Sequence, residues 1–439
     1  MGKHTKAPLP QKPLPANSCT VTVDGADYTA ITEGLATVLF PKRAPAVARG
    51  RKDKELEVEG NVSGDVFYNP IQQFNRDLSV LAIRTFAEIF FADAKKCRRR
   101  KRPAGDKKKK KEGVGEAEGG AEEQEQEQEQ EQEQEQEQEQ EQEEDRRGKG
   151  PLPKFAILDA LSATGLRALR YALELPMVTS ATANDLDPSA MESIRRNIKY
   201  NQQRHAVSLG PDTHPTAAEA VAKVKPSLAN ARHHMYSVLS PLPSDDGGAG
   251  GGSPRSSKYE VIDLDPYGTA APFLDAAVQA VADGGLLCVT CTDAGVWAST
   301  GYSEKCYSLY GGLPVKADWS HEAGLRLILQ SIAMAAAKYG LFVEPLLSLS
   351  IDFYARVWVR VRHGPVHVKK LASESMIVYT CNEGCGCWVE QRLGKARATA
   401  AKSGQGSFLR FGLARAPTVG ENCPHCQSVM HVRDLPPLP

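Results

Sequence analysis

The residues Asp265, Pro266, Tyr267 and Gly268 form the stretch of the sequence best suited to chemistry on a ligand. They follow residues 259–264, whose apolar side chains predict a buried strand that ends at this turn. The Asp265 carboxylate can accept a hydrogen bond from an exocyclic amine, and Tyr267 offers a ring for stacking. Pro266 has no N–H to donate, and Gly268 allows a close approach of the backbone. The segment suits a flat base with an exocyclic amine, although an ordinary strand-to-helix turn has similar residues.

Two pairs of cysteines near the end of the sequence form a second candidate site. Cys381 and Cys385 are separated by three residues, Cys423 and Cys426 by two, and the pairs lie about 40 residues apart. Two such pairs in one short segment are typical of a tetrahedral structural zinc site. Cys387 is a further candidate ligand, and free buried cysteines are the alternative interpretation.

The segments that must position these residues alternate between strand and helix patterns. Strands are expected at 155–161, 178–185, 259–264, 284–293, 346–351 and 354–361, and helices at 165–175, 189–201, 274–282 and 322–339. This alternation predicts a mostly parallel, doubly wound α/β sheet, with the last two strands as a hairpin at one edge. Further strand-like runs occur at 20–23 and 36–40, and a helix is expected within 67–91.

Composition divides the chain into a tail at 1–19, a larger domain at 20–365 and a small second domain at 366–439. The larger domain contains two inserts. Residues 97–150 hold a basic block and a Glu-Gln alternation with almost no apolar residues, which predicts disorder. Residues 205–257 are polar and rich in Gly and Ser, which predicts partial disorder around a short strand or helix near 230–239.

The net charge of zero hides a basic character in most of the chain. Residues 112–145 hold 17 acidic and no basic residues, so the remainder has 54 basic against 37 acidic residues, or +17. This excess suggests a polyanionic partner such as nucleic acid, although some basic residues lie in the flexible segments 3–12 and 95–111. The sequence has no apolar run long enough for a membrane span and no secretory pattern at its start, so a reducing compartment is expected.

The first two strands of the expected sheet end in residues suited to a nucleoside ligand. Asp159 precedes the small residues 162–165, which open a helix whose N-terminus can accept a carboxylate. Asp185 ends the next strand, where an acidic side chain can bind the two hydroxyls of a ribose. The dinucleotide fingerprint is absent. A nucleoside joined to a carboxylate fits S-adenosylmethionine, unless Asp159 and Asp185 only cap helices.

Eight segments of the sequence carry a resemblance to one family, in that family's order. They are F-N-R-D at 74–77, L-D-A-L-S-A-T-G-L-R-A-L-R-Y-A at 158–172, A-N-D-L-D at 183–187, D-L-D-P-Y-G-T-A-A-P-F-L-D-A-A at 263–277, C-T-D at 291–293, Y-G-G-L-P-V-K at 310–316, H-E-A-G-L-R-L-I-L at 321–329 and E-P-L-L-S-L-S-I-D-F-Y-A-R-V-W-V at 344–359. The sequence resembles the tRNA (guanine-26-N2)-dimethyltransferase family over about residues 28–426, apart from the inserts. The resemblance implies a Rossmann-like class I methyltransferase sheet that uses S-adenosylmethionine to methylate N2 of guanine 26 in tRNA once or twice.

The resemblance also implies roles for residues of the cofactor site. Arg76 and Arg167 would hold the methionine carboxylate end, and Asp185 would bind the ribose. Asn230 and Ala231 would lie beside the adenine. The family usually has Asp at the position of Asn230, and Asn keeps an oxygen that can accept a hydrogen bond from the adenine amine.

The resemblance places Asp265, Pro266, Tyr267 and Gly268 in the catalytic pocket. Asp265 would accept the N–H of the guanine amine, and Tyr267 would stack on a guanine turned out of the tRNA. Residues 366–439 would form a zinc-bearing, tRNA-binding α+β domain, in which one residue is inserted into the first cysteine pair relative to the usual C-x2-C. Thr292-Asp293 and His321-Glu322 match the family without an assigned role.

Two other classes of protein remain open from the sequence. One is a methyltransferase for the amine of adenine or of a protein glutamine, but the second Pro typical of that class is absent after Asp265. The other is a non-catalytic, zinc-bearing RNA-binding protein. The basic block at 97–111 predicts the nucleus as the location inside the cell, with the cytosol and organelles as alternatives. No membrane association and no obligate protein partner are expected.

Overall fold

The computed structural model describes residues 18–42, 68–101, 153–208, 217–239, 257–381, 383, 385–400 and 407–435. Most of the predicted tail at 1–19 and of the predicted insert at 97–150 lies outside these residues. Within the described part, residues 18–19 begin a strand and residues 97–101 end a helix, so both predicted disordered segments were drawn slightly too long. The chain divides into two compact units, of which one comprises Met1–Phe90 with Phe155–Pro439 and the other Phe91–Lys154. The candidate sites all lie in the first unit.

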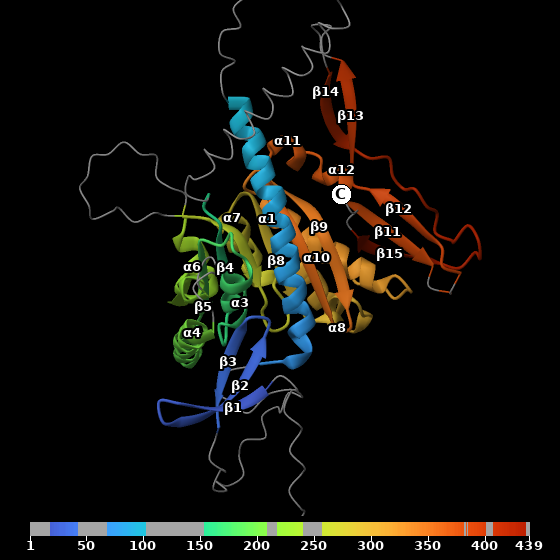
Figure 1. Ribbon diagram of the computed structural model, residues 1–439. Helices are drawn as coiled ribbons and strands as arrows, with labels where there is room; N and C mark the ends of the chain where they lie inside the picture. The colour runs from blue at the N-terminus through green and yellow to red at the C-terminus, as the bar shows by residue number, and fades with distance from the viewer. Residues whose placement is uncertain are drawn as a thin grey trace, which may run out of the picture. The chain divides into compact units, whose positions relative to one another are not determined.

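A seven-stranded sheet forms the centre of this unit, and β4, β5, β8 and β9 of this sheet are labelled in Figure 1. The strand order is β6-β5-β4-β7-β8-β10-β9. Its strands are β4 (Ala156–Asp159), β5 (Ser180–Asp185), β6 (Val224–Leu228), β7 (Tyr259–Leu264), β8 (Val281–Cys291), β9 (Leu341–Ile351) and β10 (Tyr354–His363). The strands from β6 to β8 are parallel, whereas β10 is antiparallel to both β8 and β9. This confirms the predicted α/β sheet and the hairpin at its edge.

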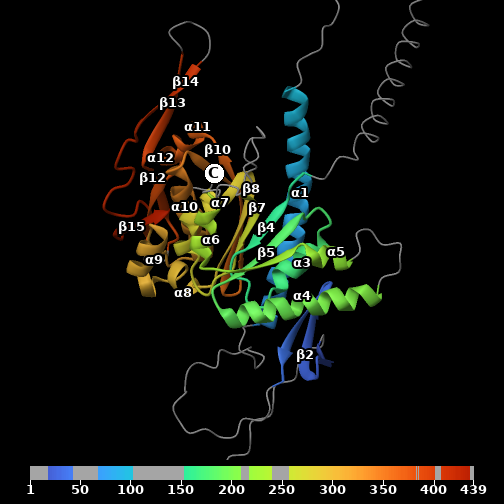
Figure 2. The same ribbon diagram turned by 90° about the vertical axis from the view of Figure 1, so that its left-hand side faces the viewer.

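Helices cover both faces of the sheet (Figure 2). On one face, α1 and α3 bond through Ser79 and Tyr171 to buried charged residues of β10 and β7. On the other, α6, α7 and α10 share an apolar core with Ile262 and Leu264 of β7. The helices of this part are α1 (Gln73–Lys101), α3 (Leu166–Glu174), α4 (Pro188–Ser208), α5 (Ala217–Ala222), α6 (Ala231–Ser237), α7 (Leu274–Ala280), α8 (Ala294–Trp297), α9 (Ser303–Tyr310) and α10 (Ser320–Ala337), with short 3-10 turns at Pro70–Gln72, Ala271–Phe273 and Thr300–Tyr302.

A smaller antiparallel sheet precedes α1 and consists of β1 (Ser18–Val23), β2 (Ala26–Glu33) and β3 (Ala36–Pro41). Asn197 and Asn201 of α4 accept hydrogen bonds from the backbone N–H groups of Leu39 and Thr37, both at 2.9 Å. Asn197 also donates to the carbonyl of Thr164 at 2.8 Å. The edge of the small sheet is therefore joined through α4 to the turn after β4, which satisfies backbone groups that would otherwise be unpaired.

The chain after β10 forms separate small sheets. The helices α11 (Pro365–Val368) and α12 (Leu371–Glu374) lead into β11 (Met376–Cys381), which pairs with β12 (Trp388–Arg392) and β15 (Met430–Leu435). The strands β13 (Gly394–Ala400) and β14 (Ser407–Leu413) form a hairpin of their own. The small sheets after His363 are separate from the central sheet. The domain boundary near residue 366 stays a prediction, since Phe155–Pro439 belong to one compact unit.

Part of the predicted insert at 205–257 has regular structure. Residues 217–239 hold α5, β6 and α6, and β6 is an edge strand of the central sheet. Only Val224 of β6 is buried, and Pro226 suits an edge strand because such a strand has one unpaired side. No helix in the described part of the chain is long and apolar enough to cross a membrane.

Candidate active site and cysteine centre

The turn from Asp265 to Gly268 lies at the carboxyl end of β7, beside the point where the strand order reverses between β4 and β7. Gly268 has φ +77°, which L side chains rarely adopt, so the backbone conformation itself requires glycine. Thr292, just after β8, holds this residue from both sides, because the Gly268 N–H donates to its hydroxyl at 2.9 Å and its own N–H donates to the Gly268 carbonyl at 2.8 Å. Tyr267 in this turn is 72% exposed.

Arg167, in the first turn of α3, holds the carboxylate of Asp265. Its Nε and a terminal nitrogen donate to the same oxygen, Oδ2, at 3.1 and 2.5 Å. Both of these hydrogen bonds from described residues end on Oδ2, and neither ends on Oδ1. The side chain of Arg167 is 7% exposed and that of Asp265 is 22% exposed. One carboxylate oxygen is thus fixed by the protein at the end of β7, while the group stays partly accessible.

A network of buried charged residues holds the Arg167–Asp265 pair in position. Asp263, on β7, accepts from Arg356 of β10 at 2.7 Å and lies 3.5 Å from Arg167, and Tyr171 donates to its Oδ2. Ser79 of α1 accepts from Arg167 at 3.1 Å and from Arg356 at 2.9 Å. Asp263 and Arg356 are fully buried, so loss of Asp263 would leave the Arg356 charge without its counterion and cost about 3–5 kcal/mol.

Asp159 ends β4 directly beside Asp263 and is 1% exposed. Ser162 donates to its Oδ2 at 2.5 Å, whereas its Oδ1 has no hydrogen-bond partner. Burial raises the pKa of Asp159 to about 7, and the negative charge of Asp263 acts in the same direction. A buried acceptor without a donor is costly, so this oxygen is suited to a cationic ligand group.

Asp185, at the end of β5, bonds to the neighbouring backbone. Its two oxygens accept from the N–H groups of Ala163 at 2.8 Å and Asp187 at 3.0 Å. Asn230 caps α6, since its side-chain oxygen accepts from the N–H groups of Arg232 at 3.0 Å and His233 at 3.4 Å. Both residues lie at the carboxyl edge of the sheet as expected, and both have a structural role there.

Arg76 has a partner within the chain. Its Nε and a terminal nitrogen donate to the two oxygens of Glu33, at 2.7 and 2.5 Å, and Tyr68 donates to the same carboxylate at 2.8 Å. The terminal nitrogen also donates to the carbonyl of Asn69 at 3.0 Å. Arg76 is therefore buried in an ion pair between α1 and the end of β2.

Residues after β8 connect the same turn to the helices behind it. The Tyr310 hydroxyl lies 2.8 Å from the hydroxyl of Thr269 and donates to Asp293, whose oxygens lie at 2.8 and 3.0 Å. Burial raises the pKa of Asp293. His321 contacts the hydroxyl of Ser350 at 2.7 Å and the edge of Trp297. Thr292 and Asp293 thus hold the turn that carries Asp265 in place, whereas His321 is exposed and contacts Ser350 and Trp297 instead.

Two cavities of about 340 and 360 Å³ lie among the described residues, between α10 and α11–α12 and between α7, α9 and α10. Neither is lined by Asp265, Tyr267 or Asp159. The candidate site lies instead at the charged turn after β7, because open α/β sheets bind ligands at the switch point of the strand order.

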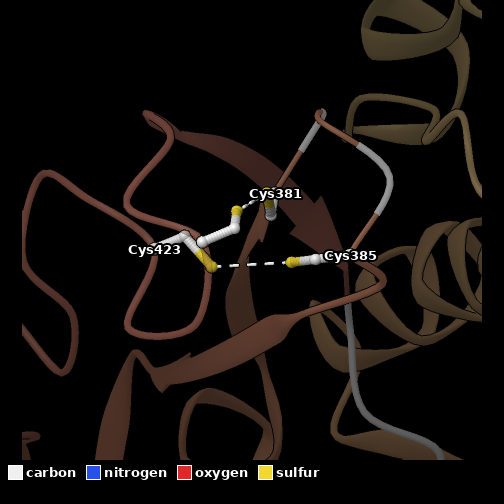
Figure 3. Close-up of side chains that lie close together, drawn as sticks. Cys381, Cys385 and Cys423 are labelled. Carbon is white, nitrogen blue, oxygen red and sulfur yellow. Dashed lines mark hydrogen bonds between the residues drawn. The ribbon is translucent and has the colours of Figure 1, made fainter.

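The cysteine centre brings together Cys381, Cys385, Cys423 and Cys426, whose sulfur atoms all lie within 4.8 Å of one another (Figure 3). The Cys381–Cys426 and Cys385–Cys423 sulfur distances are 3.4 and 3.6 Å. Four thiolates about 2.3 Å from a tetrahedral zinc ion lie about 3.8 Å apart, so the arrangement fits such an ion. Cys387 is not one of these four residues, although its thiol bonds to the Cys423 sulfur, and its carbonyl accepts from the N–H of Cys381 at 3.0 Å.

In the turn between Cys423 and Cys426, backbone N–H groups point toward the Cys423 sulfur. The N–H groups of Cys426 and His425 bond to the Cys423 sulfur, and they lower the pKa of this thiol to about 6. The Cys423 N–H donates to Ser428 at 2.7 Å, and the Gln427 N–H donates to the Cys423 carbonyl at 3.0 Å. A closed turn of this kind favours thiolates, which are the form that binds metal.

The mixed α/β sheet defines a Rossmann-like protein, and its polar residues gather at the switch point, where sheets of this kind bind ligands. A model of the family described as N2,N2-dimethylguanosine tRNA methyltransferase matches residues 50–435, and the chain belongs to this family. The chain is 41% identical to the tRNA (guanine(26)-N(2))-dimethyltransferase of Schizosaccharomyces pombe and 38% identical to the mitochondrial enzyme of that name from Saccharomyces cerevisiae.

These alignments cover 84% and 92% of the chain but 58% and 60% of the two relatives, so the chain spans little more than half of their length. The fold is similar to that of Trm1 from Pyrococcus horikoshii, solved in complex with S-adenosyl-L-methionine. That match has a TM-score of 0.53 and 22% identity, and it covers 83% of this chain and 69% of the other.

Proposed function

We propose that this chain transfers one or two methyl groups from S-adenosylmethionine to N2 of guanine 26 in tRNA. The family, the names of the relatives and the cofactor bound to Trm1 of Pyrococcus horikoshii support this activity. The observation that carries the proposal is the Asp265 carboxylate at the end of β7, which Arg167 holds through one oxygen in a partly accessible position.

The residues at the carboxyl edge fit S-adenosylmethionine. The unpartnered Oδ1 of Asp159 suits the α-ammonium group, because a cation would satisfy a buried acceptor and stabilise its charge. We assign Asp185 to the ribose and Asn230 with Ala231 to the adenine. The oxygens of Asp185 and Asn230 already accept backbone N–H groups. Each oxygen has two lone pairs, so these bonds leave acceptor capacity for the ligand.

Arg76 and Arg167 pair with Glu33 and Asp265, so contact with the methionine carboxylate would require one of them to exchange partners. We assign Arg167 to the positioning of Asp265. Arg76 joins α1 to β2 and thereby supports the wall of the cofactor site. Both arginines remain near the expected site, but they act on it through carboxylates of the chain.

When bound, the cofactor supplies a sulfonium methyl group. The N2 lone pair of guanine is delocalised into the ring, so the amine is a weak nucleophile. Asp265 accepts an N–H of this amine, which raises the electron density on nitrogen, and then takes the proton as the N–C bond forms and the methyl–sulfur bond breaks. General-base help of this kind contributes roughly 10²–10⁴-fold, and alignment of the two reacting atoms contributes further.

Tyr267 is the residue that receives the guanine ring. It is 72% exposed and two positions from Asp265, in a turn fixed by Thr292. A guanine within folded tRNA must leave its stack to reach this turn, and an aromatic face recovers part of the lost stacking energy. Pro266 and Gly268 set the backbone conformation that places Asp265 and Tyr267 together.

We also propose that Cys381, Cys385, Cys423 and Cys426 bind one structural zinc ion and that residues 366–439 form a tRNA-binding domain. Sulfur geometry supports the metal, and the basic residues of this segment support RNA binding. The nucleus stays a prediction, since most of the basic block at 97–111 lies outside the described residues and one relative is named as mitochondrial.

The proposed activity is tested by methyl transfer from labelled S-adenosylmethionine to unmodified tRNA, followed by nucleoside analysis. Methylated N2-guanosine should form on wild-type tRNA and not on a tRNA with adenine at position 26. Transfer to both tRNAs would refute the assigned position. Cofactor binding without transfer to any tRNA would refute the proposed activity.

A further inference from the structure

The β13–β14 hairpin exposes both of its faces. Every residue of β14 is exposed, and no residue of β13 is buried. At its base the hairpin is anchored to the described structure, where Gly394 packs against the backbone of Ala372 and the Leu393 N–H donates to the Ser375 carbonyl at 3.0 Å. Isolated two-stranded hairpins are marginally stable in water, so this element is well suited to contact with a partner.

The strand register separates the side chains of the hairpin into two faces of different chemistry. Arg397 pairs with Arg410, Lys395 with Gly412 and Thr399 with Phe408. Because side chains alternate along a strand, Lys395, Arg397, Phe408 and Arg410 share one face, which we call the basic face. The opposite face carries Ala396, Ala398, Leu409, Phe411 and Leu413.

The charges of the basic face have no counterpart in the described structure. No ion pair joins Lys395, Arg397 or Arg410 to another described residue, and residues 391–420 contain six basic and no acidic residues. Arg397 and Arg410 face each other directly across the two strands, which destabilises a hairpin by itself. The Arg410 guanidinium lies over the Phe408 ring, 5.5 Å from its centroid. Paired cations beside an exposed aromatic ring are typical of surfaces that bind RNA.

We propose that the basic face of the β13–β14 hairpin binds the sugar–phosphate backbone of the tRNA substrate, with Phe408 against an unstacked base or a ribose. A polyanion would relieve the repulsion between Arg397 and Arg410, and phosphate groups match the charge of the face. The tRNA as partner rests on the proposed function. The apolar face of the hairpin would remain free for another contact.

The test compares two double variants in full-length protein. Arg397→Gln/Arg410→Gln removes the facing cations, and Ala396→Glu/Ala398→Glu makes the same charge change of −2 on the opposite face. The affinity for fluorescent unmodified tRNA is measured by anisotropy between about 50 and 200 mM salt, together with thermal stability and S-adenosylmethionine binding. This assay requires no methyl transfer, so its result is independent of whether the proposed activity is correct.

We expect Arg397→Gln/Arg410→Gln to weaken tRNA binding about tenfold and to lower the slope of log affinity against log salt by roughly 1 to 2. Thermal stability should stay equal or rise, because a repulsion is removed, and cofactor binding should not change. Ala396→Glu/Ala398→Glu should bind tRNA within about twofold of wild type. Equal losses in both variants would show a general charge effect and overturn the proposal, as would wild-type affinity in the arginine variant. A loss of tRNA affinity in the control variant alone would also overturn the proposal. Such a loss would indicate that the apolar face of the hairpin, and not the basic face, contacts the tRNA.

Discussion

Arg167 donates two hydrogen bonds to a single oxygen of Asp265, across 98 positions of sequence. The same guanidinium reaches Ser79 and Asp263, so the carboxylate at the end of β7 is joined to α1, α3 and β10. The position of Asp265 is thus set by a charge network that is buried at its centre. Since catalysis depends on the placement of the reacting groups, changes in this network should affect turnover before they affect cofactor binding.

The variant Arg167→Lys tests this relationship. Lysine keeps the charge but cannot make the two-point contact with Oδ2, so we expect kcat to fall about tenfold to a hundredfold. The Kd of S-adenosylmethionine should change less than threefold. A variant with normal kcat and a strongly raised Kd would instead assign Arg167 to the methionine carboxylate.

Asp159 should make stability depend on pH. Its pKa is about 7 in the folded protein and near 3.8 when exposed, so the folded state holds the extra proton between these values. Because the folded state binds more protons than the unfolded state in this pH range, the free energy of unfolding falls as pH rises through it. From pH 6 to pH 8 the wild type should lose on the order of 1 kcal/mol relative to Asp159→Asn, or roughly 1–2 °C in Tm.

Thermal melts of both proteins without cofactor check this difference. Asp159→Asn should also bind S-adenosylmethionine more weakly, since an amide cannot neutralise the α-ammonium group. Parallel melting curves from pH 6 to pH 8, with equal cofactor affinity, would count against both roles of Asp159.

The hydrogen bond between Thr292 and Gly268 should affect the rate of turnover, because it fixes the turn that carries Asp265. Thr292→Val keeps the shape but removes the hydroxyl that accepts the Gly268 N–H, so the turn that carries Asp265 and Tyr267 loosens. We expect kcat to fall about tenfold at unchanged cofactor affinity, with recovery in Thr292→Ser. If Thr292→Ser were as slow as Thr292→Val, the hydroxyl would not be the cause.

The cysteine centre should hold one zinc ion per chain. Cys423→Ser should lower the zinc content and the stability of the segment after β10, because structural zinc stabilises small domains by about 10 kcal/mol or more. Cys387→Ser is the matched control and should retain zinc, since Cys387 is not one of the four clustered cysteines. Elemental analysis of both purified variants decides the point, and equal zinc content in the two would contradict the assigned ligand set.

The sequence predicts the central fold well where strands are buried on both sides. Residues 155–161 and 259–264 are apolar enough to be recognised as strands, and their ends carry the expected polar residues. The sequence did not predict β6, because this edge strand has the sequence V-K-P-S-L and buries only Val224. Its pattern therefore looks like that of a polar insert.

The residues that support the site could not be paired from sequence. Asp263 and Arg356 are charged residues inside apolar strands, which signals buried pairing, but the 93 positions between them leave the partner undetermined. Ser79 gives no signal at all, because a serine in a helix is ordinary until the fold places two arginines beside it. The role of Thr292 likewise depends on the neighbouring strands β7 and β8.

In the proposed reaction, Asp265 accepts the proton of the guanine amine. Asp265→Asn removes the base but keeps the size and one hydrogen-bonding oxygen, and Asp318→Asn makes the same change at an exposed position. Single-turnover methyl transfer to tRNA should slow at least a hundredfold in Asp265→Asn, while S-adenosylmethionine and tRNA bind normally and Asp318→Asn behaves as wild type. Transfer by Asp265→Asn at a rate close to that of wild type would contradict the account.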